Sequence, residues 1–347
     1  MSFTHDLVPE AAAALDYDSY VRQPDGSVLT QSSAQDTILH LCRMLELAPG
    51  LRVLEVGTGS GYTSALLGRI VGDQGSVVSL DVDPRLTERA RIRHAQGGLG
   101  NVAVHTADGY AGWAAGAPYD RIIGWAAPPL LPHAWVEQAA DRAVIVTPVT
   151  VASIAQAHLL LRVDLHHGRP TLRDVQAGGF IEMHPEVITE VAVPIRYRDG
   201  LCQPTGGEAV WISAPTLRDS PQGARRAAQM IAEGHSVPSP LDNDYAAYRA
   251  FCGYLYARQP HGLASAGFAR IGPASTWGIG LVRTDSAAVL CPGDMSIAGT
   301  EEAEELLRAL ITEWAHAGQP DHTTLRPILL PSVGGFSIEV QVKREAR

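Results

Sequence analysis

The chain has 347 residues, of which 46% are hydrophobic and 18% charged, and its formal net charge at pH 7 is −10. This length suits two domains, and the composition is that of a globular protein with a sizeable core. The acidic balance, without any long Lys/Arg run, argues against a nucleic acid as the main partner.

No apolar stretch reaches the roughly 18 residues that a membrane span needs, so we expect no membrane partner. The N-terminus (MSFTHDLVPE) lacks the basic and apolar regions of a signal peptide. Cys42, Cys202, Cys252 and Cys291 are far apart in the sequence, which fits neither a zinc cluster nor a disulfide framework. We therefore expect a cytoplasmic protein with reduced cysteines and no metal; the sequence predicts no oligomeric state.

The first 50 residues favour two helices and a turn. Residues 9–15 are rich in alanine and predict a short helix, and the Pro-Asp-Gly sequence at 24–26 predicts a turn. Apolar residues at helical spacing predict a second helix that ends near residue 47, with Ser32, Ser33 or Asp36 as candidate N-caps.

The stretch VLEVGTGSGY at 53–62 predicts a ligand-binding turn. Its apolar start suits a strand buried on both faces of a parallel sheet, and helical spacing resumes at Tyr62. Three glycines in between let backbone N–H groups approach a ligand closely, at the place where open α/β sheets bind small ligands. The spacing G-x-G-x-G differs from the dinucleotide fingerprint G-x-G-x-x-G. With the acidic Glu55 just ahead, the turn favours S-adenosylmethionine (SAM), whose amino and sulfonium groups are cationic, over a pyrophosphate cofactor.

Strands and helices alternate over the rest of the first half. We expect strands at 76–80, 102–105, 119–125 and 143–149, and helices at 84–95 and 133–140. This alternation predicts a parallel, doubly wound, Rossmann-like α/β sheet. Apolar segments at 158–164 and 171–175 flank His166-His167-Gly168 and predict an antiparallel hairpin added to that sheet.

The pattern changes after residue 184, so we predict a first domain over 1–184 and a smaller α/β or α+β domain over 185–347. Expected strands of the second domain cover 190–197, 209–213, 277–283, 287–291, 325–330 and 337–343. Expected helices cover 221–233, 244–256 and 301–317.

Two acidic residues at strand ends extend the predicted ligand site. Asp81 ends the second strand, where a carboxylate can accept hydrogen bonds from ribose hydroxyls. Asp108, before Gly109 after the third strand, could accept a hydrogen bond from an adenine amino group, and it could equally cap a turn. A glycine turn, a ribose acid and an adenine acid thus follow each other in the order that an adenosine cofactor needs.

With these residues the chain resembles the protein-L-isoaspartate O-methyltransferases. The matching strings are VLEVGTGSGY at 53–62, LDVDP at 80–84, NVxVHxxDGY at 101–110, APYDRII at 117–123, the AAPPLLP loop and GGF at 178–180. The resemblance covers roughly residues 17–184 and implies a SAM-dependent methyltransferase that transfers a methyl group to a carboxylate in a peptide. The cofactor-binding residues expected from the pattern and the resemblance together are Glu55, Gly57, Thr58, Gly59, Ser60, Gly61, Tyr62, Asp81, Val82, Asp108 and Gly109.

The chain departs from this family in the loop that is expected to receive the substrate carboxylate. Where the family has TISQPY, this chain has QSSAQD at 31–36, which keeps the serine as Ser33 but loses the Gln-Pro pair and the aromatic residue. A serine hydroxyl can donate to a carboxylate oxygen, so Ser33 and Ser32 are the candidate catalytic residues. The alternative is that both serines only cap the following helix.

The altered loop and the additional second half favour a specialised enzyme that esterifies an aspartyl or isoaspartyl carboxylate of one ribosomally made peptide. The ester then closes to a succinimide (aspartimide), and S-adenosylhomocysteine is the other product. A carboxylate is ionised at neutral pH, so no general base is required. The alternatives are a general repair enzyme for isoaspartyl proteins, an RNA methyltransferase and a SAM-binding module without activity.

Overall fold

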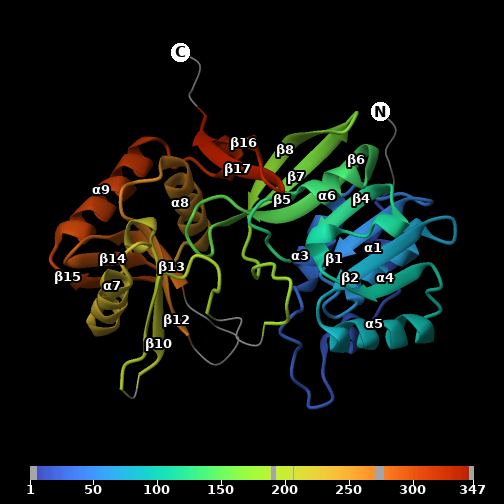
Figure 1. Cartoon of the computed structure of the whole chain (residues 1–347), viewed down its shortest axis with the longest axis horizontal. Coiled ribbons are helices and arrows are strands. Elements are labelled where there is room, and N and C mark those ends of the chain that lie inside the picture. The colour runs from blue at the N-terminus through green and yellow to red at the C-terminus, as the bar shows by residue number, and fades with distance from the viewer. Residues whose placement is uncertain (1–5, 189–192, 206, 270–276, 344–347) are drawn as a thin grey trace.

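The computed structural model of the chain describes residues 6–188, 193–205, 207–269 and 277–343, which form two seven-stranded sheets and one three-stranded sheet. Figure 1 shows the first half, in blue to green, beside the second half, in yellow to orange, with the final hairpin in red at the top between them. The division into domains at residue 184 stays a prediction.

The first sheet has the strand order β3-β2-β1-β4-β6-β7-β8. Five strands pair in parallel: β1 (Arg52–Val56), β2 (Ser76–Asp81), β3 (Val102–Thr106), β4 (Tyr119–Gly124) and β6 (Ala139–Thr150). The hairpin of β7 (His158–His166) and β8 (Arg169–Ala177) adds two antiparallel strands, as predicted. The strand order reverses between β1 and β4, which is where open α/β sheets bind ligands.

Six helices flank this sheet in the described part of the first half. They are α1 (Val8–Ala13), α2 (Tyr17–Val21), α3 (Gln35–Met44), α4 (Tyr62–Val71), α5 (Pro84–Gln96) and α6 (His133–Glu137). Successive residues of β1 point to opposite faces, so Val53 joins a core with α3 and α4 while Leu54 and Val56 join the core on the other face. These elements confirm the predicted doubly wound sheet.

Two predicted elements of the chain differ from the structure. The predicted helix at 133–140 ends at Glu137, because β6 already begins at Ala139 and pairs with β4. The predicted strand at 190–197 is wrong in its described part, since residues 193–197 form bends and turns. The N–H groups of Ile195 and Arg196 donate to the Glu182 carboxylate rather than to a neighbouring strand. The start of that segment lies outside the described residues.

The second sheet is antiparallel throughout and has the order β11-β15-β14-β13-β12-β10-β9. Its strands are β9 (Gly200–Cys202), β10 (Ala209–Ser213), β11 (His235–Pro238), β12 (Leu263–Ala269), β13 (Trp277–Val282), β14 (Ser286–Leu290) and β15 (Asp294–Gly299). Its helices are α7 (Pro221–Glu233), α8 (Tyr245–Arg258) and α9 (Glu302–His316). The second half is therefore of the α+β type, one of the two predicted classes. The strands β9, β11, β12 and β15 were not predicted.

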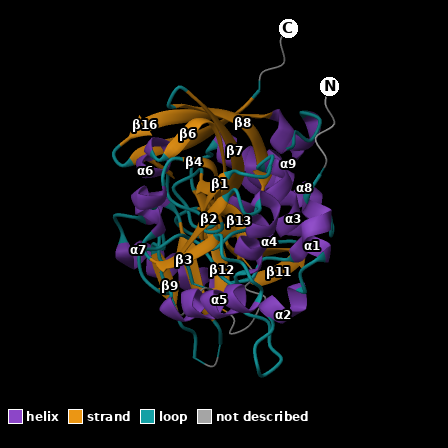
Figure 2. Cartoon of the chain, turned by 90° about the vertical axis from the view of Figure 1, so that its right-hand side faces the viewer, coloured by secondary structure: helices purple, strands orange, loops and turns teal. Residues whose placement is uncertain are grey.

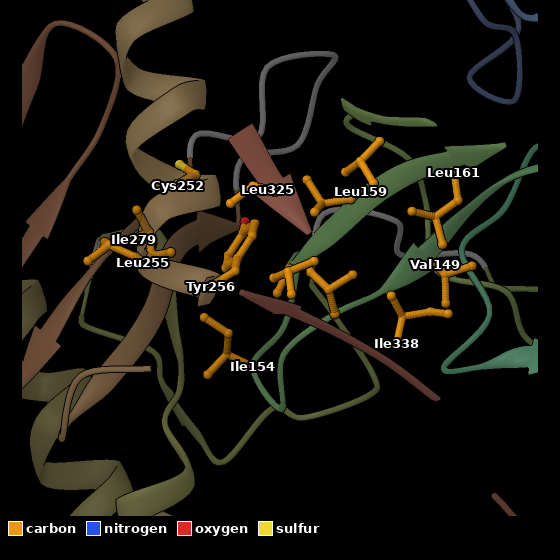
Figure 3. Packing of buried hydrophobic residues seen from close by; sticks show 14 of the residues in the cluster. Val149, Ile154, Leu159, Leu161, Cys252, Leu255, Tyr256, Ile279, Leu325 and Ile338 are labelled. Atoms are coloured by element: carbon orange, nitrogen blue, oxygen red, sulfur yellow. The ribbon is translucent and has the colours of Figure 1, made fainter. Parts of the chain in front are cut away.

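The C-terminal hairpin of β16 (Leu325–Ser332) and β17 (Gly335–Val342) connects the two halves. β17 pairs with the short β5 (Leu131–Pro132) of the first half, and α8 packs against β17. One hydrophobic core runs from Leu54 on β1 to Trp314 on α9. Figure 3 shows Ile338 of β17 close to Val149 of the first sheet, and β16 packs against β8 at the top of the molecule in Figure 1. Figure 2 shows the same strands at the top after a turn of 90°. None of the described helices is long and apolar enough to cross a membrane.

Candidate cofactor and acceptor site

The glycine turn between β1 and α4 has no room for side chains. Gly57, Gly59 and Gly61 have φ angles of 99°, 50° and 80°, in the left-handed region that favours glycine. A Cβ atom on Gly57 would lie 3.0 Å from the Cβ of Trp125, and one on Gly59 would lie 2.4 Å from the carbonyl oxygen of Gln31. The turn is thus covered closely by Trp125 on one side and by Gln31 on the other.

Asp81 lies at the end of β2, directly beside the glycine turn. Its Oδ2 accepts the N–H of Gly59 at 3.0 Å, and its Oδ1 accepts the N–H of Asp83 at 3.0 Å. Burial raises the pKa of the Asp81 carboxyl. Each oxygen keeps a further lone pair, so Asp81 can still accept hydrogen bonds from two hydroxyl groups.

Glu55 lies beneath the turn and is fully buried. Its Oε2 accepts the Ser79 hydroxyl at 2.6 Å, its Oε1 accepts the indole N–H of Trp125 at 3.2 Å, and the hydroxyls of Thr58 and Ser79 are 2.7 Å apart. Burial raises the pKa of Glu55 to about 8. The carboxyl is therefore mostly protonated at pH 7 and would ionise more readily next to a cation.

The other predicted cofactor residues occupy different surroundings. Asp108 caps the short 3₁₀ turn Gly109–Ala111 by accepting the N–H of Tyr110 at 2.9 Å, which is the turn-capping role given as its alternative. Gly109 packs closely on β1, since a Cβ there would lie 2.2 Å from Val56 Cγ1. Tyr62 is buried in the core behind the turn, Ser60 is buried within the turn, and Val82 is half-buried. Their cofactor contacts stay predictions.

The predicted acceptor loop lies against the glycine turn through the contact of Gln31 with Gly59. The Ser32 hydroxyl oxygen is buried and has no hydrogen-bond partner among the described residues. The carbonyl of Ser33 accepts the Tyr17 hydroxyl at 2.8 Å. Helix α3 has Ala34 at its N-cap position and no side-chain cap, so the alternative that these serines cap the helix is wrong.

Comparison with known proteins decides the family. Residues 8–182, about half of the chain, match the family model described as Protein-L-isoaspartate(D-aspartate) O-methyltransferase (PCMT). The chain belongs to the PCMT family. The family depends on SAM, and the side-chain-free glycine turn with Asp81 beside it and Glu55 beneath it fits this cofactor.

The curated relatives are shorter proteins that match less than half of this chain. The chain is 40% identical over 146 residues to Protein-L-isoaspartate O-methyltransferase 2 of Archaeoglobus fulgidus, over 42% of this chain and 65% of the relative. It is 38% identical over 146 residues to Protein-L-isoaspartate O-methyltransferase of Methanococcus maripaludis, over 42% of this chain and 68% of the relative. The chain thus spans about two thirds of the length of these relatives.

Two solved structures are also similar at a low level. One protein-L-isoaspartate O-methyltransferase is 18% identical with a TM-score of 0.41, covering 88% of this chain and 81% of that chain. A putative protein-L-isoaspartate O-methyltransferase from Plasmodium falciparum, in complex with S-adenosyl-L-homocysteine, is 17% identical with a TM-score of 0.45, covering 53% of this chain and 92% of that chain.

A residue outside the PCMT match, Arg196, joins three loops at the ligand-binding edge of the sheet. Its guanidinium donates to the carbonyl of Ala127 at 3.3 Å, to the carbonyl of Met183 at 2.6 Å and to the hydroxyl of Tyr110 at 3.0 Å. Glu182 accepts the Arg196 N–H at 3.0 Å through Oε2, while its Oε1 is buried without a partner in the described chain. Sequence reasoning missed Arg196 because its partners Ala127 and Tyr110 are 69 and 86 residues away, and no local pattern marks them.

Thr150 and His158 face each other across β6 and β7 at the same edge. The Nδ1 of His158 lies 3.2 Å from the Phe180 carbonyl oxygen. The His158 Nε2 and the Thr150 hydroxyl are buried, and neither has a partner within the described ranges. Burial, and then the positive charge of Arg196, lower the pKa of His158 to about 3, so its imidazole is neutral at pH 7. Because the carbonyl of Phe180 can only accept, the proton of the neutral ring lies on Nδ1 and Nε2 is an acceptor. This side of the PCMT site therefore offers an uncharged hydroxyl donor and an imidazole acceptor near the Arg196 guanidinium.

Proposed function

We propose that this protein is a SAM-dependent carboxyl O-methyltransferase that esterifies an aspartyl or isoaspartyl carboxylate of a peptide. The observation that carries the proposal is the contact between Gln31 and Gly59, because it brings the cofactor turn and the loop with the unpartnered Ser32 hydroxyl together. A donor site and an acceptor site in direct contact are what a methyl transfer requires.

For this reaction the protein has to position the two reactants, and it does not have to supply a general acid or base. SAM, when bound, supplies a methyl group on a positively charged sulfur. The acceptor carboxylate is ionised at neutral pH, so it is already a nucleophile. Ser32 can donate its hydroxyl to the oxygen that does not react, which holds the other oxygen roughly 3 Å from the methyl carbon. One C–O bond forms, the C–S bond breaks with its electron pair left on sulfur, and no proton is released.

The ester then reacts without further help from the enzyme. The next backbone nitrogen of the peptide attacks the ester carbonyl carbon and loses its proton, and methanol leaves. The resulting succinimide takes up water and opens to aspartate or isoaspartate. The same transfer therefore repairs isoaspartate or, from an ordinary aspartate, creates it.

We further propose that the substrate is one ribosomally made peptide that the protein modifies in the cytoplasm. Two features support this specialised reading. The QSSAQD loop at 31–36 differs from the family loop, and the second half, which lies outside the family match at 8–182, shares a hydrophobic core with the first. The names of those relatives favour the second candidate, general repair of isoaspartyl proteins.

Isotopic methyl transfer from labelled SAM to a panel of peptides tests this function. The specialised reading predicts a kcat/KM for unrelated isoaspartyl peptides at least about 100-fold below that for a small precursor peptide encoded beside the gene, a difference of about 2.7 kcal/mol. Equal transfer to many unrelated isoaspartyl peptides would support general repair instead. SAM binding without transfer to any peptide would leave only a binding module, and tight RNA binding at low salt would point to an RNA methyltransferase.

A further inference from the structure

Arg249 on α8 is a buried cation without an ionised partner among the described residues. It is 6% exposed, and its guanidinium donates to the carbonyl of Gly178. No carboxylate in the described part of the chain forms an ion pair with it. A buried charge of this kind is strongly destabilising unless a counter-ion is present. The planar guanidinium fork matches the two oxygens of a carboxylate.

Buried polar side chains lie on α8 and on the segments that pack near it. Within the described residues, the hydroxyl of Tyr256 and the Nε2 atoms of His322 and His158 are buried and have no hydrogen-bond partner, and the buried Tyr248 hydroxyl interacts with the Cys252 thiol. We call the two tyrosines, the two histidines and Arg249 the Arg249 cluster. Tyr248 and Tyr256 belong to α8, as Arg249 does. The tyrosine hydroxyls and the neutral His322 imidazole can each donate a hydrogen bond to an anion, whereas the single proton of neutral His158 lies on Nδ1, toward the Phe180 carbonyl, and its Nε2 is an acceptor.

Burial lowers the pKa of both histidines, and the positive charge of Arg249 lowers it further. Burial, and then the positive charge of Arg249, lower the pKa of His322 to about 4. For His158, burial, Arg196 and then Arg249 lower the pKa to about 3. The Nε2 of His322 also lies 3.2 Å from the position of a Cβ on Gly253 of α8, so its ring packs on the same helix.

The Arg249 cluster lies between the two halves, on the acceptor side of the cofactor turn. Figure 3 shows Tyr256 projecting from α8 toward Leu159 of β7. The paired residues Thr150 and His158 mark the end of β6, and β6 is two strands away from β1 in the sheet. Because neighbouring strands are about 4.8 Å apart, β6, whose Thr150 faces His158 of the cluster, is about 10 Å from β1 across the sheet.

We propose that Arg249 is the centre of a carboxylate-binding site between the two halves, and that a second carboxylate of the acceptor peptide occupies it. The peptide source rests on the proposed function. The bound carboxylate is not the one that is methylated, since β6, beside the cluster, is already about 10 Å from β1 across the sheet and pairing with arginine would weaken a nucleophile. An extended peptide covers about 10 Å in roughly three residues, so the favoured substrate carries an acidic residue about three positions from the reacting one.

Thermal denaturation of the full-length protein tests the site itself. N-acetyl-L-glutamate, compared with sodium chloride at equal ionic strength, is expected to raise the Tm of the wild type and to leave Arg249→Met unchanged. Arg258→Met is the matched control, because Arg258 ends the same helix, is half-exposed and pairs with Glu313 at 2.8 Å; its response should equal that of the wild type. Arg249→Lys keeps the charge without the fork and should show a response several-fold weaker, even if the methionine variant does not fold. Equal responses of the wild type and the folded Arg249 variants would overturn the site.

Methyl transfer from labelled SAM tests the source of the carboxylate. The probes are isoaspartyl peptides that carry either Glu or Gln about three residues from the isoaspartate. The wild type and Arg258→Met should have about a 10-fold lower KM for the Glu peptide at an unchanged kcat, and Arg249→Met should lose this difference. Equal KM values with an intact thermal response would assign the site to a free small carboxylate and overturn the peptide source. Absence of all transfer, with SAM binding intact by calorimetry, would contradict the proposed function. The thermal response alone would then show whether Arg249 binds a carboxylate.

Discussion

The two ends of the ligand-binding edge differ in how well their polar groups are paired. At the cofactor end, both carboxyl oxygens of Glu55 and both of Asp81 accept hydrogen bonds. At the acceptor end, polar atoms of Ser32, Thr150 and His158 are buried without a partner in the described residues. Next to the glycine turn, the Nδ1 of His94 is also buried without a partner in the described chain, behind the contact of its Nε2 with the Gly61 carbonyl. Buried polar groups in native proteins are rarely unpaired, so the paired carboxyl groups support our proposal of a preformed cofactor site and the unpaired groups that of an acceptor site that requires a ligand.

The polar atoms of Ser32, Thr150 and His158 lie within the family match, as the cofactor end does, but two cations near the acceptor end do not. Arg196 and Arg249 come from outside residues 8–182 and donate to Tyr110 and Gly178 inside it. We therefore propose that the family part presents the methyl donor and that the residues after it add cationic groups beside the acceptor.

The most damaging change to the cofactor end should be Gly59→Ala. Its Cβ would lie 2.4 Å from the Gln31 carbonyl oxygen, in addition to the strain of a φ of 50°. We expect SAM affinity, measured by calorimetry, to fall at least about 100-fold. Gly72→Ala is the control, because Gly72 has a φ of 62° but nothing within 4 Å of its Cβ position. Wild-type affinity in Gly59→Ala would show that the turn is not held closely by the acceptor loop.

Because the two halves share a core, the stability of both should depend on the C-terminal hairpin. Ile338 of β17 is buried in this core, so Ile338→Ala should lower the free energy of unfolding by about 2 kcal/mol or more, measured by urea denaturation. Val333→Ala, at the fully exposed tip of the same hairpin, should change it little. Separate unfolding of the two halves, with only one transition shifted by Ile338→Ala, would contradict a common core.

Glu55 should make stability depend on pH. Its pKa in the folded protein is raised by burial from 4.5 to about 8, so the folded state binds this proton more tightly than the unfolded chain. Between these two pH values the stability should fall as pH rises, by up to about 1.4 kcal/mol per unit, and level off above pH 8. Glu55→Gln should remove this part of the slope in thermal denaturation measured from pH 5 to 8. The same slope in both proteins would mean that Glu55 stays ionised.

Ser32→Ala should have the smallest effect of these variants, and it should change acceptor binding without changing cofactor binding. The variant removes a buried hydroxyl that has no partner in the described chain, so the Tm should stay the same or rise slightly. The KM for the acceptor peptide should rise about 10-fold, because a hydrogen bond to a charged group is lost, while SAM affinity is unchanged. Ser27→Ala, at an exposed turn, should alter neither value. A loss of SAM affinity in Ser32→Ala would show that Ser32 contributes to cofactor binding instead.

Local patterns predicted the residues of the cofactor end because short stretches of sequence determine where strands end and where glycine turns form. Asp81 was placed by its position after an apolar strand, and its contact with Gly59 follows from that strand order. Arg249 could not be found in this way, since its carbonyl partner Gly178 is 71 residues away. The strand β12 was missed because its sequence LASAGFA consists mostly of small residues without alternation. The loop comparison favoured Ser33, but the serine hydroxyl of this loop that is buried without a partner in the described chain is that of Ser32.

The most direct test of the proposed reaction is the chemical stability of the transferred label. The full-length protein, methyl-labelled SAM and isoaspartyl or aspartyl peptides should give a labelled peptide that releases labelled methanol in mild base, as a methyl ester does. A label that survives base would place the methyl group on nitrogen or carbon, and no labelled peptide at all would leave SAM binding without transfer. Either result would contradict a carboxyl O-methyltransferase.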